Sequence, residues 1–302
     1  MTKVVSYLRG IPNLKNPDKP EMLKRFVEGV NSAGDTGIVH NSLDVINADV
    51  AVLQGWVHDG SPTTPHLRLR KKVAETQQRR NKNTIIIDSN LFNYTGNQTP
   101  TYLRYSMNGV FPTTGNYFNK HADPARWEQI KRDYNIDLKP WRKKGRHILI
   151  CTQRNGGWSM QGNSVIKWLN ETVAELKKHT DRPIVVRGHP GDRRAKQYLK
   201  PHPHYVVSQN KSILQDFQKA WAVVTYNSTP SVAASIEGIP AFVTDPIPQT
   251  SQAYDVSTHN LSLIETPQIK DREDWIKRIC MCHWNFDELS NGDAWRHMRK
   301  YI

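Results

Sequence analysis

The chain has 302 residues, of which 37% are hydrophobic and 9% aromatic, so a disordered protein is excluded. Its length predicts one large or two medium domains, each burying its own core. Lys and Arg number 42 against 28 Asp and Glu, and the formal net charge of +14 favours an anionic partner such as nucleic acid, a membrane surface or an acidic polymer.

Two further features concern location. The N-terminal "MTKVVSYLRG" lacks the apolar core of a signal peptide, and no apolar run is long enough to be a membrane helix. The 3 cysteines fit a reducing compartment, and "CMCH" at 280–283 lacks the second ligand pair of a zinc site. We therefore expect a cytoplasmic protein with no membrane attachment and no bound metal.

The first half of the chain alternates short apolar runs with helix-like segments. This order predicts a parallel sheet covered by helices. Strands are expected at 3–8, 35–41, 48–57 and 83–90, and helices at 21–34 and 66–82.

The segment 66–83 is strongly basic, with seven cations facing the single acid Glu75. It is either a solvated helix face or a surface that contacts the phosphate backbone of a nucleic acid. The same two alternatives apply to a smaller basic cluster at 139–146. The cations that we assign to DNA binding in this segment are Arg68, Arg70, Lys71, Lys72, Arg79, Arg80 and Lys82.

The segment 91–118 is rich in Asn, Thr, Tyr and Gly and has weak periodicity, which predicts a long functional loop. A helix is expected next, within 123–138, followed by a Pro- and Lys-rich joint at 139–146. We place the domain boundary there, with one domain at 1–140 and the other at 141–302.

The second half repeats the alternation of strands and helices and predicts a second doubly wound sheet. The Trp-rich segment 271–302 is expected to be helical, and it belongs to the second domain or packs back on the first. The predicted fold is therefore α/β, with two Rossmann-like domains facing a cleft. Strands are expected at 147–153, 182–188, 204–208, 221–226 and 240–245, and helices at 164–180, 212–220 and 229–238.

Several catalytic motifs are absent. No Gly-x-Gly-x-x-Gly follows a strand, and neither a Walker A sequence nor His-Glu-x-x-His occurs. Asp-x-Asp, the pair with which metal-dependent sugar transferases hold a divalent ion, is also missing. A dinucleotide oxidoreductase, a P-loop kinase and a zinc hydrolase are thus disfavoured, and we expect no cofactor.

Polar residues follow three predicted strands of the second half, where ligands of open α/β sheets bind. Gln153 and Arg154 follow the first strand, Arg187 and His189 the second, and Gln209 the third. Arg and His can pair with phosphate. A plain solvated turn is the alternative at each place.

A fourth strand exit is "AVVTYNSTPSVAASIEGIPAFVTDP" at 222–246. Ser228 or Thr229 suits a helix N-cap, and Pro230 suits the first helical turn. The start of a helix also favours an anion, so these residues either cap the helix or hold a phosphate. Glu237 at the far end of the helix could accept hydrogen bonds from a ribose.

This stretch resembles the segment of GT-B glycosyltransferases in which a Ser/Thr-rich loop and helix precede Glu-Gly-x-Pro. "VVRGHP" at 185–190 is similar to the Arg-x-His-Pro stretch of transferases that act on bacterial capsule and lipopolysaccharide sugars. The resemblance covers about 145–246. It implies that the C-terminal domain binds a nucleotide sugar, with UDP as the default, and the N-terminal domain an acceptor, often without metal.

The resemblance also implies roles for individual residues. Arg154 and His189 would contact the diphosphate, Ser228 and Thr229 the phosphate at the helix start, and Glu237 the ribose. GT-B enzymes often carry a further acidic residue after this segment, for which Asp245 is the nearest candidate.

Sugar transfer with inversion needs a base near the acceptor hydroxyl. Asp88 directly follows a buried apolar run, and Asp59 stands beside His58 at another strand exit. We expect one of these carboxylates, or His58, to be the base. A turn-forming Asp is the alternative for both carboxylates.

The chain also resembles phage enzymes that glycosylate hydroxymethylated pyrimidines, such as 5-hydroxymethylcytosine, in double-stranded DNA. In this interpretation the helix at 66–82 runs along phosphates, and Arg104, Tyr102, Tyr105 and Phe111 stack on or replace a flipped base. One alternative is a transferase of bacterial surface polysaccharide or lipopolysaccharide. Another is a non-catalytic α/β protein that binds nucleic acid.

Overall fold

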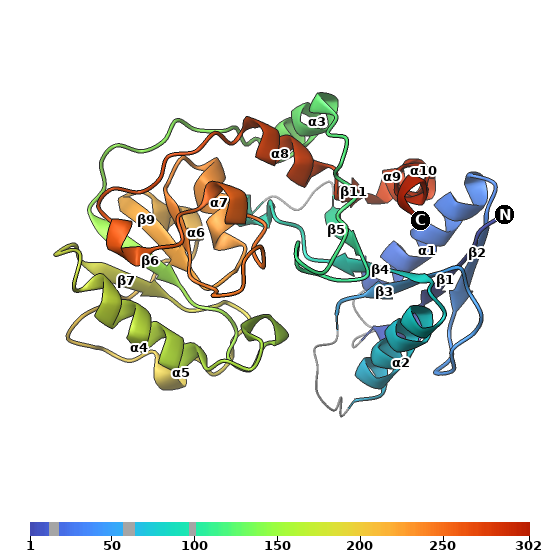
Figure 1. Cartoon of the computed structure of the whole chain (residues 1–302), viewed down its shortest axis with the longest axis horizontal. Helices are drawn as coiled ribbons and strands as arrows, with labels where there is room; N and C mark the ends of the chain where they lie inside the picture. Colours follow the sequence, from blue (N-terminus) through green and yellow to red (C-terminus); the bar gives the residue numbers. More distant parts are fainter. Residues whose placement is uncertain (12–17, 57–63, 97–100) are drawn as a thin grey trace. The chain divides into compact units, whose positions relative to one another are not determined.

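The computed structural model describes residues 1–11, 18–56, 64–96 and 101–302 (Figure 1). The chain divides into two compact units, here called the first unit (1–90, 98–127 and 277–302) and the second unit (91–97 and 128–276). Each unit contains its own largely parallel sheet covered by helices, which confirms the predicted α/β class with two Rossmann-like domains. Residues 128–140 group with the second unit; the functional boundary near residue 140 stays a prediction.

The sheet of the first unit has the strand order β11-β5-β4-β3-β1-β2. Strands β1 to β4 run parallel, whereas β5 is antiparallel to both β4 and β11. The strands are β1 Lys3–Tyr7, β2 Thr36–His40, β3 Val50–Gln54, β4 Asn83–Asp88, β5 Tyr102–Met107 and β11 His283–Asn285. The helices of this unit are α1 Asp18–Ser32, α2 Pro65–Arg79, α9 Phe286–Ser290 and α10 Asp293–Met298.

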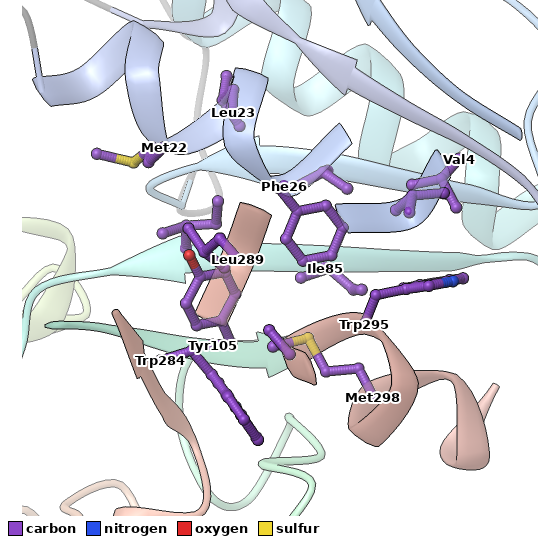
Figure 2. Packing of buried hydrophobic residues seen from close by; sticks show 14 of the residues in the cluster. Val4, Met22, Leu23, Phe26, Ile85, Tyr105, Trp284, Leu289, Trp295 and Met298 are labelled. Carbon is purple, nitrogen blue, oxygen red and sulfur yellow. The ribbon is translucent and has the colours of Figure 1, made fainter. Parts of the chain in front are cut away.

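Alternating side chains of the strands fill two cores, because successive residues of a strand point to opposite faces. Val50 and Val52 of β3 belong to the core that contains Phe26 of α1 (Figure 2). Ala51 and Leu53 lie in the other core, which contains Leu69 and Val73 of α2. The helices α1 and α2 therefore cover opposite faces of the sheet.

The C-terminal segment completes the first unit. The Trp295 ring of α10 packs edge-on against Phe26 at 6.0 Å, and its Nε1 donates to Asp35 Oδ2 at 2.8 Å (Figure 2). Gly29 of α1 allows a close approach, since a Cβ there would lie 1.8 Å from the Leu289 carbonyl oxygen. The helices α9 and α10 thus pack against α1.

Two predictions for the first unit are wrong. The expected long loop at 91–118 contains strand β5, and the C-terminal segment expected to be helical contains strand β11. The two strands pair with each other across more than half of the sequence, with Tyr102 opposite Asn285. This long-range antiparallel pairing leaves no local periodicity by which to find it.

The second unit has the all-parallel strand order β10-β9-β6-β7-β8. Its strands are β6 His147–Cys151, β7 Ile184–Arg187, β8 Val206–Val207, β9 Ala220–Thr225 and β10 Ala241–Val243. The helices α4 Val165–Leu176, α5 Ala195–Tyr198, α6 Ile213–Phe217 and α7 Pro230–Ile236 alternate with them. The chain passes between the units within α3 Pro124–Tyr134 and in the middle of α8 Glu273–Cys280.

The strand order reverses between β6 and β9, and such a reversal is where open α/β sheets bind ligands. Helix α4 packs on one face, where Trp168 and Leu169 meet Ile148 and Ile150. On the other face, Leu149 lies in a core with residues of α6 and α7. Because helices cover both faces of this sheet, a ligand has access to it at the carboxyl edge. None of the helices in the described ranges is long and apolar enough to cross a membrane.

His283 is a titratable group inside the first unit. It is fully buried in β11, and its Nδ1 lies 2.9 Å from the Ile279 carbonyl oxygen. Burial lowers its pKa to about 3; the contact with that carbonyl opposes the shift, and Arg104 and Arg126 add to it.

We therefore predict a stability loss in mild acid. The unfolded chain has a His pKa of about 6.5, so below this pH the unfolded state binds a proton that the folded state does not. The free energy of unfolding falls with decreasing pH, with a slope approaching about 1.4 kcal/mol per pH unit from this residue. His283→Gln should remove this contribution, whereas His121→Gln at an exposed position should not. Urea unfolding from about pH 7 to about pH 5 measures the difference, and an unchanged slope in His283→Gln would contradict it.

Candidate ligand site at the carboxyl edge of the second sheet

Two buried amide side chains connect the loops at the place where the strand order of the second sheet reverses, between β6 and β9. Gln153 follows β6 and Asn227 follows β9, and the Gln153 Oε1 accepts the Asn227 backbone N–H at 3.1 Å. The Gln153 Nε2 donates to Ser159 Oγ at 2.6 Å, and Gln153 is only 2% exposed. The predicted ligand contact of Gln153 is therefore corrected: both ends of its amide hold the loops together.

Asp245, which follows β10, is the centre of this arrangement. Its Oδ2 accepts hydrogen bonds from Asn227 Nδ2 at 2.7 Å, Thr250 Oγ1 at 2.7 Å and Gln161 Nε2 at 3.0 Å. Its Oδ1 accepts the Ile247 N–H at 3.0 Å. Neutral donors thus satisfy a buried carboxylate, and Asp245 ties together the loops after β6, β9 and β10.

Asn227 is a site residue that the sequence analysis missed. It is 5% exposed and stands directly before the predicted phosphate-binding residues. The signal in the sequence was an Asn at the end of an apolar run, which also fits an ordinary turn. Only its contacts with Gln153 and Asp245 separate the two interpretations.

The start of α7 is not capped by side chains. Thr229 occupies the N-cap position without a side-chain capping bond, and Pro230 begins the helix. The Ser228 carbonyl accepts from both Ser231 N–H, at 3.1 Å, and Ser231 Oγ, at 2.7 Å. The Ser228 Oγ has no hydrogen-bond partner among the described residues. Capping therefore does not account for Ser228 and Thr229, and their contact with phosphate stays a prediction.

His189 lies in the loop after β7 with one nitrogen engaged. Its Nδ1 accepts the Gly191 N–H at 3.0 Å, so the neutral ring carries its proton on Nε2. Burial lowers the pKa of His189, the nearby Asp192 opposes this shift, and Arg154 reinforces it. At neutral pH the ring is an uncharged hydrogen-bond donor.

Asp192 ties the loop after β7 to the loop after β6. Its Oδ2 accepts the Asn155 N–H at 3.0 Å and the Tyr198 hydroxyl at 2.7 Å. Burial raises the pKa of Asp192, but these bonds and one from the Arg194 N–H bring it below its ordinary value. Arg154, one of the predicted phosphate contacts, is exposed in the same loop.

The structure gives Arg187 a different role from the one predicted. Its Nη1 pairs with the buried Asp216 Oδ2 at 2.6 Å, and its Nη1 and Nη2 donate to the carbonyls of Asn210 and Lys211, both at 3.0 Å. This guanidinium holds the loop after β8 and is not free for a ligand. Gln209 in that loop is exposed and donates to the Val207 carbonyl at 3.3 Å, so its ligand contact stays a prediction.

Glu237, the predicted ribose contact, follows α7 and already has two partners. Its Oε1 accepts the Tyr94 hydroxyl at 3.2 Å, and its Oε2 pairs with Lys139. Burial and the carboxylate raise the pKa of Tyr94 far above its ordinary value, so this hydroxyl stays protonated and donates. Contact with a ribose stays a prediction for Glu237.

The expected catalytic base is not identified. The Asp88 Oδ2 at the end of β4 pairs with Arg104 Nη2 at 2.5 Å, so this carboxylate is engaged in a salt bridge. Asp59 and His58 lie outside the described residues.

Four residues that we assigned to DNA are buried. Arg104 is 7% exposed, and Tyr102 and Tyr105 are at most 1% exposed, so the predicted contact with phosphate or a flipped base is wrong for them. Arg70 is 6% exposed and bonds to the Gly10 carbonyl at 2.7 Å, which removes it from the outer face of α2. Phe111 is half-buried.

The other cations of the basic segment lie at the surface to different degrees. Lys82 pairs with Asp49 at 2.8 Å, Arg80 donates to Asn47 Oδ1 at 3.2 Å, and the half-buried Lys71 lies 4.0 Å from Glu75. The exposed residues Arg68, Lys72 and Arg79 lie at helical spacing along α2. In the ranges that the structure describes, no three His, Cys, Asp or Glu side chains gather in a way that could hold a metal ion.

Comparison with known proteins identifies the fold. No family model and no curated protein matches the chain. The beta Kdo 2,4 transferase KpsC of Thermosulfurimonas dismutans is similar in structure, with a TM-score of 0.57 at 11% identity over 94% of this chain and 92% of that one. The beta Kdo 2,7 transferase KpsC of the same organism has a TM-score of 0.49 at 13% identity, over 97% and 98%. The first of these similarities, together with the two Rossmann-like sheets, shows that the chain has the GT-B fold.

Because Arg187 is paired with the buried Asp216, we expect that replacing Arg187 lowers the stability of the protein. Arg187→Met should leave the Asp216 carboxylate, whose side chain is 1% exposed, without its cation, and lower the free energy of unfolding by about 3 kcal/mol. Arg154→Met, at an exposed position, should change it by about 0.5 kcal/mol or less. Denaturant unfolding of both variants tests this. A fully stable Arg187→Met protein would show that Arg187 is available for a ligand after all.

Proposed function

We propose that this protein is a glycosyltransferase that moves a sugar from a nucleotide-activated donor to a hydroxyl of a glycan. The observation that carries the proposal is the carboxyl edge of the second sheet. There, buried side chains tie the loops together, while among the described residues the His189 Nε2 makes no hydrogen bond and the Ser228 Oγ has no partner. The GT-B fold supports the same assignment.

The chemistry of this edge suits a phosphate leaving group. Negative charge builds up on the donor phosphate as the glycosidic bond breaks, and fixed donors there stabilise the transition state more than the ground state. The neutral His189 can donate from Nε2, Arg154 can add a positive charge, and the Ser228 hydroxyl can donate beside the start of α7. UDP stays our default nucleotide, and metal-independent transfer stays a prediction.

For the acceptor, the structure favours a glycan over DNA. Arg104, Tyr102 and Tyr105 are three of the four side chains that we assigned to the flipped base, and all three are buried. Arg70, assigned to the phosphate backbone, is buried as well. The solved structure that supports the fold is named as a Kdo transferase. We therefore propose a sugar acceptor of the bacterial surface polysaccharide or lipopolysaccharide kind.

DNA that carries hydroxymethylated pyrimidines is the second candidate acceptor. One observation favours it: Arg68, Lys72 and Arg79 lie exposed along α2 in a chain of net charge +14. Such a row of cations can follow a phosphate backbone.

The donor site is tested by transfer assays. The protein is incubated with a panel of nucleotide sugars and oligosaccharide acceptors, and products are identified by mass spectrometry. His189→Ala should lower kcat/KM by about 100-fold, because one fixed donor to the leaving phosphate is lost. His202→Ala, at an exposed position away from this edge, is the matched control and should leave the rate unchanged. Equal rates in both variants, or no turnover of any nucleotide sugar, would contradict the proposal.

The acceptor is tested on hydroxymethylcytosine DNA, with unmodified DNA alongside. Under our proposal, nucleoside mass spectrometry finds no new nucleoside. If DNA is the acceptor, a glycosylated nucleoside appears, and replacing Arg68, Lys72 and Arg79 together by Gln abolishes it. The charge-matched control replaces the exposed Lys167, Lys177 and Lys219 of the second unit by Gln and should retain it. Glycan transfer should survive both triple changes.

A further inference from the structure

The first unit contains a pocket along α2, on the side of the helix that faces the start of β4 and the turn after β5. Its volume is about 590 Å³. Residues from three parts of the unit line it, including Gly55 and Trp56 after β3, Arg70 and Gln78 of α2, and Asn108 after β5. All of these belong to the first unit, whereas the proposed donor site belongs to the second.

Arg70 is the unusual residue of this pocket, because it is a buried cation without an anion. Its Nε donates to the Gly10 carbonyl at 2.7 Å and its Nη2 to Gln54 Oε1 at 3.2 Å, and both acceptors are neutral. Among the described residues, no carboxylate lies within 4.0 Å of the guanidinium. Burial lowers the pKa of Arg70 to about 10, with Asp88 opposing the shift, so the group is still charged at neutral pH.

Part of the Arg70 guanidinium is available to a ligand. A guanidinium has five N–H donors, and the protein uses one on Nε and one on Nη2. The Nη1 makes no hydrogen bond within the described ranges. Gly55 makes room for this nitrogen, since a Cβ there would lie 2.8 Å from it, and the backbone φ of +77° suits glycine.

The rest of the pocket wall is mostly polar, with one aromatic ring. It includes the cations Lys71 and Lys82, of which Lys82 pairs with Asp49 at 2.8 Å. Amide and hydroxyl groups of Gln78, Asn81, Asn83 and Thr114 contribute to it, together with the Trp56 side chain. The Asn108 Nδ2 donates to Asn83 Oδ1 at 2.8 Å, which orders that side of the wall. Among the described lining residues, Glu75 is the one carboxylate, and it lies 4.0 Å from Lys71 Nζ.

We infer that this pocket is an acceptor subsite for a sugar residue that carries a carboxylate, with Arg70 as the group that pairs with it. A planar guanidinium matches a carboxylate, the neutral amides match sugar hydroxyls, and an indole offers a flat apolar surface for a sugar ring. The two lysines of the wall each lie beside a carboxylate of the protein, whereas a nucleic-acid backbone would call for several exposed cations that it can neutralise itself. The inference rests on the proposed function in taking the acceptor to be a glycan.

The subsite is tested by calorimetric binding to the full chain, with a galacturonate oligomer as the acidic probe and a galactose oligomer as the neutral one. The acidic probe should bind more tightly. Arg70→Met, which keeps an unbranched side chain, should lower the affinity for the acidic probe by about tenfold or more. It should leave the affinity for the neutral probe unchanged. Arg79→Met, at an exposed position of the same helix, is the matched control and should lower the affinity for the acidic probe by less than about twofold.

A second pair of variants covers the case in which Arg70→Met does not fold. Gln78→Glu places a negative charge at an exposed position of the pocket wall and should lower the affinity for the acidic probe several-fold. Gln197→Glu makes the same charge change at an exposed position of the second unit and should have little effect.

Four results would overturn the inference. They are equal binding of the two probes, equal losses in Arg70→Met and Arg79→Met, equal effects of Gln78→Glu and Gln197→Glu, and displacement of the acidic probe by inorganic phosphate or a DNA oligonucleotide at similar concentration. Nucleotide-sugar binding measured on the same samples separates the two proposals. If the nucleotide sugar binds but the acidic probe does not, the subsite fails while the proposed function stands.

Discussion

The buried carboxylate of Asp245 is the constraint on which the candidate site depends. A charge that is 7% exposed must be stabilised by its surroundings, and here neutral donors from three loops do so. The same bonds fix where those loops lie, because Asn227 reaches Gln153 on the neighbouring strand exit. The edge between β6 and β9 is thereby ordered before any ligand arrives, and preorganised donors are what stabilisation of a developing charge requires.

The chain satisfies its buried and half-buried arginines in two ways: Arg187 and Arg104 are paired with carboxylates, whereas Arg70 is not. In the second unit, Arg187 and Asp216 neutralise each other, and Asp245 is surrounded by donors. In the first unit, Arg70 has neutral partners and part of its guanidinium unused. A fully paired charge supports the structure, whereas an incompletely paired one beside a pocket can recognise a ligand.

Much of the fold was predictable from the sequence, because parallel strands and their helices follow one another along the chain. The strands that were missed, β5 and β11, pair over a long sequence separation and carry no local signal. Site residues were harder to predict. Arg187 and His189 stand at the same strand exit, yet one is locked to Asp216 while the other keeps a free nitrogen. Strand-exit position indicates where a ligand can bind, but hydrogen-bond partners decide which side chains are available to it.

Hydrogen–deuterium exchange of the full chain, with and without a saturating nucleotide sugar, tests the central claim most directly. A donor site at this edge predicts slower exchange in peptides from the loops after β6, β7 and β9, which cover 153–163, 188–194 and 226–231. Peptides from α1 should be unchanged, because α1 belongs to the core of the first unit. Slower exchange confined to the first unit, or none in those three loops under conditions where the nucleotide sugar binds, would contradict a donor site at this edge.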